Sequence, residues 1–233
     1  MKQTTRSLLI MTVVTTLFLA GCADPSDKTP DAVVNDVPAT EAPAVEAPKA
    51  EMAPAETPAP EVAPVEEAPA MEANTYTIAP ASTVGFIGSK ISGSHEGGFK
   101  TFAGTVSLPG EDVTEAVIDV TIEVASAFTD NEKLTAHLLS ADFFDAEQFP
   151  QSTFVSTAIA KEGDAYSVTG NFTLHGVTKS ITFPATLSLD GDTFTASAEF
   201  DINRMDFGVK YAGKTDDLIR ENVVIQLNIE ASA

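Results

Sequence analysis

Cysteine, tryptophan and basic residues are scarce in this chain of 233 residues. The one cysteine, Cys22, excludes a disulfide framework and any metal site built from several thiolates. The three histidines (His95, His137 and His175) lie in separate predicted elements without ligand spacing, so no metal site is predicted. Lysine and arginine number 13 against 34 acidic residues, a net charge of −21. This charge argues against nucleic acid and anionic membrane surfaces as partners.

Long apolar runs are also missing, except near the N-terminus, where residues 8–20 follow Lys2 and Arg6. A run of this length is too short to span a bilayer comfortably, so residues 1–21 are predicted to be a signal peptide. The run ends in Leu-Ala-Gly-Cys, which resembles the bacterial lipoprotein signature. In that signature a diacylglycerol is attached to the cysteine sulfur, cleavage occurs before the cysteine, and the new amino end is acylated. We therefore expect lipidation at Cys22.

An acylated Cys22 predicts a protein that is lipid-anchored in the cell envelope and faces the periplasm. Two or three acyl chains anchor a protein stably, whereas one holds it only marginally. Retention in the inner membrane is often tied to an aspartate directly after the acylated cysteine. Ala23 occupies that position here and Asp24 follows it, so the expected location is the outer membrane.

Residues 22–73 differ sharply in composition from the rest of the chain. Residues 24–73 contain ten of the fourteen prolines, many alanines and twelve acidic residues against two lysines. Such a segment has too little apolar surface to offset its ordering entropy. Proline favours extended polyproline II structure, in which about 3.1 Å per residue gives a reach on the order of 150 Å. The sequence predicts a disordered acidic tether that acts as a spacer and makes few contacts with the domain.

Residues 74–233 are predicted to form one all-β domain, because hydrophobic and polar residues alternate with a period of two. The alternation is clear in the segments 116–124, 166–174, 180–189, 193–202 and 223–230. His175-Gly176 and Asp190-Gly191 offer the positive φ that tight hairpins require. With the shorter runs 75–78, 83–88, 99–108 and 152–159 the count reaches eight or nine antiparallel strands, which must form a sandwich or a barrel.

The apolar faces of these strands are rich in phenylalanine and in small residues. Large and small side chains, such as Phe194 and Ala196, alternate on the same face. A barrel filled by its own side chains uses this mixture to fit its taper, and a barrel that encloses one apolar ligand has a similar composition. Composition leaves both interpretations open.

The stretch AHLLSADFFDAEQFP, residues 136–150, places His137, Ser140 and Asp142 close together in sequence. Residues 130–146 read as a helix with Asp130 as N-cap. Asp142 lies five positions from His137 and therefore on a different helix face. A catalytic triad also needs a serine on a strained turn and an oxyanion hole, and Gly-x-Ser-x-Gly is absent. We predict that the protein is not an enzyme.

Two longer segments, HLLSADFFDAEQFPQSTFVS and VTGNFTLHGVTKSITFPATL, together with GGFKTFAGTV and FDINRMDFG, resemble the YceI family of periplasmic polyisoprenoid-binding proteins. The resemblance covers residues 75–232. It implies an eight-stranded antiparallel lipocalin-like β-barrel with a short helical segment near its opening. It also implies a long cavity for a polyisoprenoid or a similar long-chain lipid or quinone, with no cofactor. The signal sequence and tether depart from the many family members that are freely soluble.

The resemblance turns the apolar residues of the barrel into candidate ligand contacts. Phe143 and Phe144 are expected to cover the cavity mouth, and Arg204 or His137 to meet a polar headgroup. The alternative function is a non-catalytic scaffold or a stress-response envelope lipoprotein with a packed barrel, and a second copy of the chain is a further candidate partner. The predicted ligand-binding residues are Phe86, Phe102, His137, Leu138, Phe143, Phe144, Phe154, Phe172, Phe183, Phe194, Phe200 and Arg204.

Overall fold

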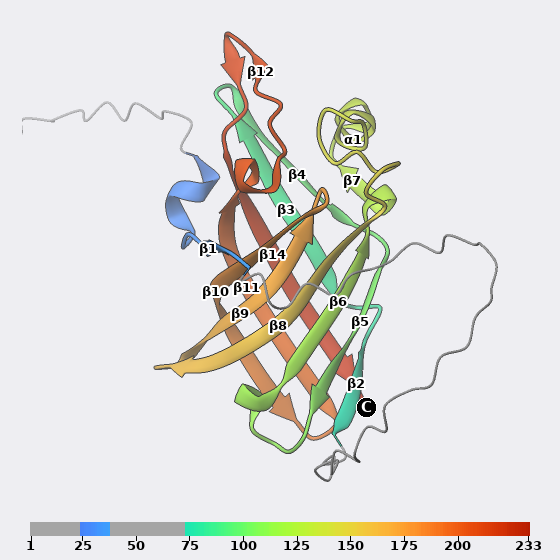
Figure 1. The fold of residues 1–233 in the computed structure, drawn as a ribbon, viewed down its shortest axis with the longest axis vertical. Coiled ribbons are helices and arrows are strands. Elements are labelled where there is room, and N and C mark those ends of the chain that lie inside the picture. Colours follow the sequence, from blue (N-terminus) through green and yellow to red (C-terminus); the bar gives the residue numbers. More distant parts are fainter. Residues whose placement is uncertain (1–23, 38–72) are drawn as a thin grey trace, which may run out of the picture.

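A computed structural model describes residues 24–37 and 73–233 (Figure 1). The predicted signal peptide, Cys22 and residues 38–72 of the predicted tether lie outside the described residues. None of the helices in the described ranges has the length and hydropathy needed to cross a bilayer.

The described chain forms the all-β, closed, eight-stranded antiparallel barrel that the sequence predicts. Inward and outward residues alternate along its strands, as a barrel with an apolar interior requires. Its strands are β2 (Asn74–Ile78), β3 (Thr83–Lys90), β4 (Gly93–Phe99), β5 (Phe102–Leu108), β6 (Val117–Glu123), β7 (Ala127–Thr129), β8 (Gln151–Glu162), β9 (Ala165–Leu174), β10 (Val177–Asp190), β11 (Thr193–Asn203) and β14 (Asn222–Ser232).

Three long strands of the barrel are interrupted, so eleven segments make eight positions around the circumference. β2 and β3 together form one position, and both pair with β14. β5 and β4 form the next position, where they pair with β2 and β3, and β6 and β7 form the third, where they pair with β5 and β4. Short 3-10 helices η2 (Val113–Glu115) and η3 (Val124–Ser126) mark two of the corners. The barrel closes because β14 pairs with β11 on one edge and with β2 and β3 on the other.

Strand β4 was missed by the sequence prediction because glycines hide its alternation. A Cβ on Gly97 would lie 2.5 Å from the carbonyl oxygen of Phe128, and one on Gly98 would lie 2.7 Å from that of Val84. These glycines therefore let β4 approach its neighbours closely, and they leave no hydrophobic pattern to detect. The predicted strand over residues 99–108 is in fact split between β4 and β5.

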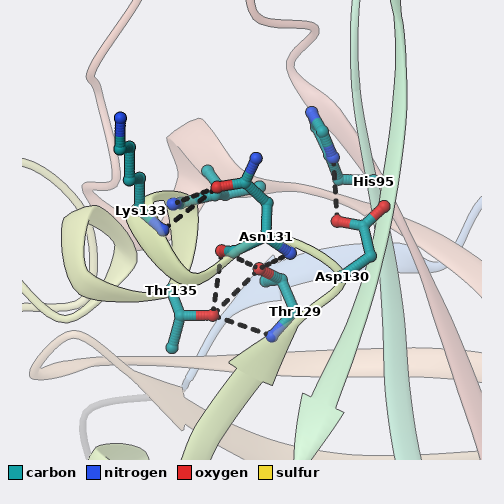
Figure 2. Close-up of polar contacts among 7 residues, drawn as sticks. His95, Thr129, Asp130, Asn131, Lys133 and Thr135 are labelled. Atoms are coloured by element: carbon teal, nitrogen blue, oxygen red, sulfur yellow. Dashed lines mark hydrogen bonds and ion pairs between the residues drawn. The ribbon is translucent and has the colours of Figure 1, made fainter.

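Helix α1 (Glu132–Leu138) is shorter than the predicted helix over residues 130–146. Figure 2 shows its start: Asn131 Oδ1 accepts hydrogen bonds from the backbone N–H groups of Lys133 and Leu134 at 3.0 and 3.2 Å. The prediction of Asp130 as N-cap is wrong, because its carboxylate contacts Nδ1 of His95 at 2.9 Å instead. Beyond Leu139 the chain continues through turns rather than helix.

The described beginning of the predicted tether is ordered on the barrel, so the prediction of disorder is wrong for residues 24–37. A 3-10 helix, η1 (Pro25–Lys28), leads into strand β1 (Val33–Asp36). β10 pairs with β11 only through residues 186–190, and β1 pairs antiparallel with β10 at residues 179–182. Strand β1 therefore occupies the edge of β10 that β11 leaves free, and it supplies the backbone hydrogen bonds which that edge needs.

Residues 30–32 bind the facing edge of β11 and complete this seam. The backbone N–H of Ala32 donates to the carbonyl of Asp201 at 2.9 Å, and the N–H of Asp201 donates to the carbonyl of Pro30 at 3.0 Å. Ala32 and Val34 pack against the barrel core, whereas Val33 is 58% exposed. A four-residue strand with one apolar face is too short to be detected among the prolines and acids around it.

A pair of carboxyl groups lies in the seam. The Asp201 side chain is only 2% exposed and accepts hydrogen bonds from Thr29 and from Asn222. Burial and then the neighbouring Asp31 raise the pKa of Asp201 to about 6, although these two hydrogen bonds oppose the shift.

Acidification is therefore expected to strengthen the docking of residues 24–37. The pKa of Asp201 in the folded state lies above its ordinary value of 3.8, so the folded state holds the proton more tightly. That contribution is fully present below about pH 4 and is lost as the pH rises through about 6. Asp201→Asn should raise the melting temperature at pH 7.5 more than at pH 5. An equal change at both pH values would contradict this assignment.

Candidate cavity of the barrel

The barrel encloses a cavity of about 480 Å³. Its wall consists of inward-facing side chains from nearly every strand, and its inner end is closed by fully buried Val106 and Phe194. Residues of α1, of the turn after it, and of residues 209–219 line the other end. In Figure 1 that end carries α1 and the small hairpin of β12 (Gly213–Lys214) and β13 (Asp217–Leu218). The cavity thus has a packed floor and a mouth.

Differences in residue size between neighbouring strands leave space along the wall. The register places Leu187 of β10 opposite Ala196 of β11, and Leu227 of β14 opposite Ala198. A Cβ added to Gly170 would lie 2.4 Å from the ring of Phe154, so the missing side chain gives this ring its room. Of the two interpretations that composition left open, the structure supports a barrel with a cavity rather than one filled by its own side chains.

Eleven of the twelve predicted ligand-binding residues line this cavity. They come from strands β3, β8, β9, β10 and β11, from α1 and the turns after it, and from η4 (Arg204–Phe207). Phe102 does not line the cavity. It is the first residue of β5 and packs against the hydrophobic core beside the cavity. Whether the eleven residues contact a ligand stays a prediction.

Two aromatic clusters form the mouth. Phe86, Phe99 and Phe144 have ring centroids 5.8 to 6.3 Å apart. His137, Phe143 and Tyr211 form the second cluster at 4.9 to 5.1 Å. Sequence reasoning missed two of these lining residues. Phe99 follows two glycines, and Tyr211 stands in a stretch of mixed charge. Neither position has a periodic signal.

His137, Ser140 and Asp142 do come together, but not as a nucleophile and its base. His137 Nε2 lies 2.8 Å from a carboxylate oxygen of Asp142, because the chain turns back after α1 ends. The expectation that they lie on different faces of one helix is therefore wrong. The Ser140 hydroxyl donates to the backbone carbonyl of His137 at 2.7 Å. A serine held in this way has no contact with the imidazole that would activate it.

Arg204 has a structural role at the base of residues 209–220. Its side chain is 6% exposed, and its guanidinium donates to the carbonyl oxygens of Val209, Ile219 and Arg220 at 2.5, 3.4 and 3.0 Å. Burial lowers the pKa of Arg204 and Glu221 partly offsets this. The guanidinium holds residues 209–220 to η4. Arg204 also lines the cavity, and its contact with a headgroup stays a prediction.

The described residues also contain no group of three or more His, Cys, Asp or Glu side chains that could hold a metal ion. At the mouth the polar lining residues are scattered among apolar ones and include Ser89, Lys90, His95, Lys214 and Asp217. The arrangement is that of a hydrophobic pocket with a polar rim, as expected for an amphiphile.

Sequence comparison agrees with this architecture. Residues 76–231 match the profile of the YceI-like domain. The chain belongs to the YceI-like family. Protein YceI of Salmonella arizonae is 43% identical to this chain over 96 residues, which are 41% of this chain and 50% of the relative. Protein YceI of Salmonella newport gives the same values. The alignment thus spans about half the length of these curated relatives.

Solved structures with YceI-like folds show the same barrel. BcnA of Burkholderia cenocepacia is 30% identical, with a TM-score of 0.60 over 66% of this chain and 99% of its own. A polyisoprenoid-binding domain from Saccharophagus degradans, described as implicated in plant cell wall breakdown, has a TM-score of 0.57 at 16% identity. It covers 68% of this chain and 98% of its own. At that identity the likeness concerns the fold alone.

Cavity-lining and packed phenylalanines are expected to differ in their contribution to stability. Phe207 is fully buried and absent from the cavity wall, whereas Phe86 is similarly buried but faces the cavity mouth. Phe207→Ala should cost about 3–5 kcal/mol of unfolding free energy. Phe86→Ala should cost clearly less in ligand-free protein, because a side chain facing a void has fewer contacts to lose. Chemical denaturation measures both values, and equal losses would contradict the cavity.

Proposed function

We propose that this protein is a non-catalytic carrier that binds a polyisoprenoid, or a similar long-chain lipid or quinone, in its barrel. The observation that carries the proposal is the apolar cavity, closed at one end and open at the other. Membership of the YceI-like family supports it. The neighbour from Saccharophagus degradans, named for polyisoprenoid binding, supports the choice of ligand class.

The cavity wall favours a tail over a polar molecule. Burying apolar surface contributes about 25 cal/mol per Å², or about 0.8 kcal/mol for each CH₂ group. A polar ligand would lose its hydrogen bonds to water against the phenylalanine and aliphatic wall. The two lysines of the lining, Lys90 and Lys214, lie at the mouth and come from two different hairpins. The ligand should therefore lie with its tail inside and its headgroup at the rim.

The alternative of a scaffold with a packed barrel finds less support, because the interior is hollow. An enzymatic function also has little support, because the Ser140 hydroxyl contacts a backbone carbonyl rather than the imidazole of His137. We place the carrier on a periplasm-facing membrane leaflet, held by acylated Cys22. This part of the proposal is supported by the sequence Leu-Ala-Gly-Cys after a short apolar run.

Filling the cavity should displace the ligand without unfolding the protein. Ala196 faces the cavity and its neighbour Thr195 is exposed on the outer face. Mass spectrometry of an organic extract from folded wild-type protein should detect a long-chain lipid, and delipidation should lower the melting temperature. A ligand at a hundredfold excess over its Kd stabilises by about 2.7 kcal/mol.

Ala196→Phe should reduce the extracted lipid several-fold, whereas Thr195→Phe should leave the amount unchanged. Both variants should keep the far-ultraviolet circular dichroism of the wild type. An extract without any apolar molecule, together with identical melting curves before and after delipidation, would refute the carrier function.

Lipidation is tested separately at Cys22. Because this is the only thiol in the chain, Cys22→Ser should abolish palmitate incorporation and move the protein from the detergent phase to the aqueous phase. Unchanged incorporation of labelled palmitate in the variant would show that the anchor lies elsewhere or does not exist.

A further inference from the structure

The mouth of the cavity is flanked by a projecting tip that carries exposed aliphatic side chains. We define the crest as residues 89–93, the turn between β3 and β4, and residues 210–221, which include β12 and β13. Figure 1 shows both hairpins projecting beyond the barrel at the end that bears α1. Ile91 and Leu218 are 55% and 45% exposed. They are adjacent, because the backbone N–H of Ile91 donates to the carbonyl of Leu218 at 3.1 Å.

Several interactions hold the crest in one shape. Lys90 forms an ion pair with Asp217, whose carboxylate also accepts hydrogen bonds from the N–H and hydroxyl of Ser92 at 3.0 Å each. The backbone N–H of Arg220 donates to the carbonyl of Ser89 at 2.9 Å, and Arg204 binds the carbonyls at the base of the crest. The exposed aliphatic side chains are therefore presented by a braced structure.

The crest also differs in charge from the rest of the domain. It contains four basic and three acidic residues, whereas the remainder of residues 74–233 contains 19 acidic and five basic residues. A strongly acidic body is repelled by anionic membrane surfaces. A nearly neutral tip with exposed aliphatic side chains is the part of this molecule that can approach a bilayer interface at the lowest cost.

The ordered N-terminal segment places Asp24, two residues after Cys22 in the sequence, at this same end. The Asp24 carboxylate forms an ion pair with Arg220 at 2.9 Å and accepts a hydrogen bond from the Ser89 hydroxyl at 3.3 Å. Both partners belong to the crest. Cys22 precedes Asp24 by two residues, and two residues of chain span at most about 7 Å. Residues 38–72 come after β1 in the sequence, so they are not the connection between Cys22 and the barrel.

We infer that the crest is a membrane-docking surface, and that the seam segment of residues 24–37 holds the cavity mouth against the bilayer to which Cys22 is anchored. This inference rests on the proposed acylation of Cys22. It assigns the bilayer interface as the partner of Ile91 and Leu218. A long-chain lipid then passes between bilayer and cavity at the rim without a long path through water, which would be costly for its apolar tail.

Depth-dependent quenching tests this orientation. The sulfur of acylated Cys22 is blocked, so an introduced cysteine is the only free thiol of the acylated protein. Gly93 in the crest and Gly110 in the loop after β5, at the opposite end of the barrel, both have open space where a Cβ would be added. Gly93→Cys and Gly110→Cys proteins carry an environment-sensitive fluorophore and are reconstituted in phosphatidylcholine vesicles that contain spin-labelled lipid.

The fluorophore at position 93 should be quenched at least twofold more than the fluorophore at position 110. Mass spectrometry of the N-terminal peptide and vesicle flotation first establish acylation and membrane attachment. With both established, equal quenching at the two positions would overturn the crest as the docking surface and leave the carrier proposal standing. A peptide without acyl chains would overturn the anchor and this orientation together.

A matched pair of variants tests whether the seam segment sets the orientation. Val34 packs against the core and its neighbour Val33 is exposed. Val34→Asp should release residues 24–37, so that vesicle flotation persists while quenching at position 93 falls to the level at position 110. Val33→Asp should leave the quenching unchanged.

If Val34→Asp fails to fold, Ile91→Ser combined with Leu218→Ser provides the same test on the crest itself. Val117→Ser, which alters an exposed aliphatic residue on the barrel side, is its control. Unchanged quenching at position 93 in the crest double variant would overturn the inference.

Discussion

Barrel closure through β14 is the constraint on which the rest of this structure depends. This strand pairs over its whole length with β11 and, on its other edge, with β3 and β2 in turn. Closure satisfies the backbone groups that an open sheet would leave at its edges, and it brings the apolar faces of all strands around one space. Without it the phenylalanines would line a curved sheet open to water rather than a cavity.

The cavity then follows from residue size within this closed frame. Closure turns the inward faces of all strands toward one space, and within the wall the register places leucines of one strand beside alanines of the next. At the floor, large side chains such as Phe194 meet neighbours that leave no space. Towards the mouth, glycine and alanine leave space that protein side chains do not fill. The same alternation of residues thus seals one end of the barrel and hollows the rest.

The seam between β10 and β11 links the barrel to the segment that precedes it. β10 pairs with β11 only at residues 186–190, and where the two strands diverge residues 30–36 supply hydrogen bonds to both of their edges. The cost is the burial of Asp201 next to Asp31, which couples this closure to pH. The same segment that completes the barrel wall also places Asp24 against the crest at the cavity mouth. Residues 24–37 therefore contact both the barrel wall and the crest at the cavity mouth.

The sequence by itself determined the fold class and most of the barrel strands, because alternation with a period of two records which side chains face inward. Eleven of the twelve residues predicted to bind a ligand also line the cavity. The sequence did not predict β4, because the glycines of that strand leave no alternation of hydrophobic and polar residues. It did not predict the structural role of Arg204 either, because the partners of this side chain are backbone carbonyls, which a sequence pattern does not reveal. It also led to the wrong prediction for residues 24–37, since their order comes from strand edges more than 140 residues away. Tertiary structure alone decided between hollow and filled, because a void depends on which residues closure sets face to face.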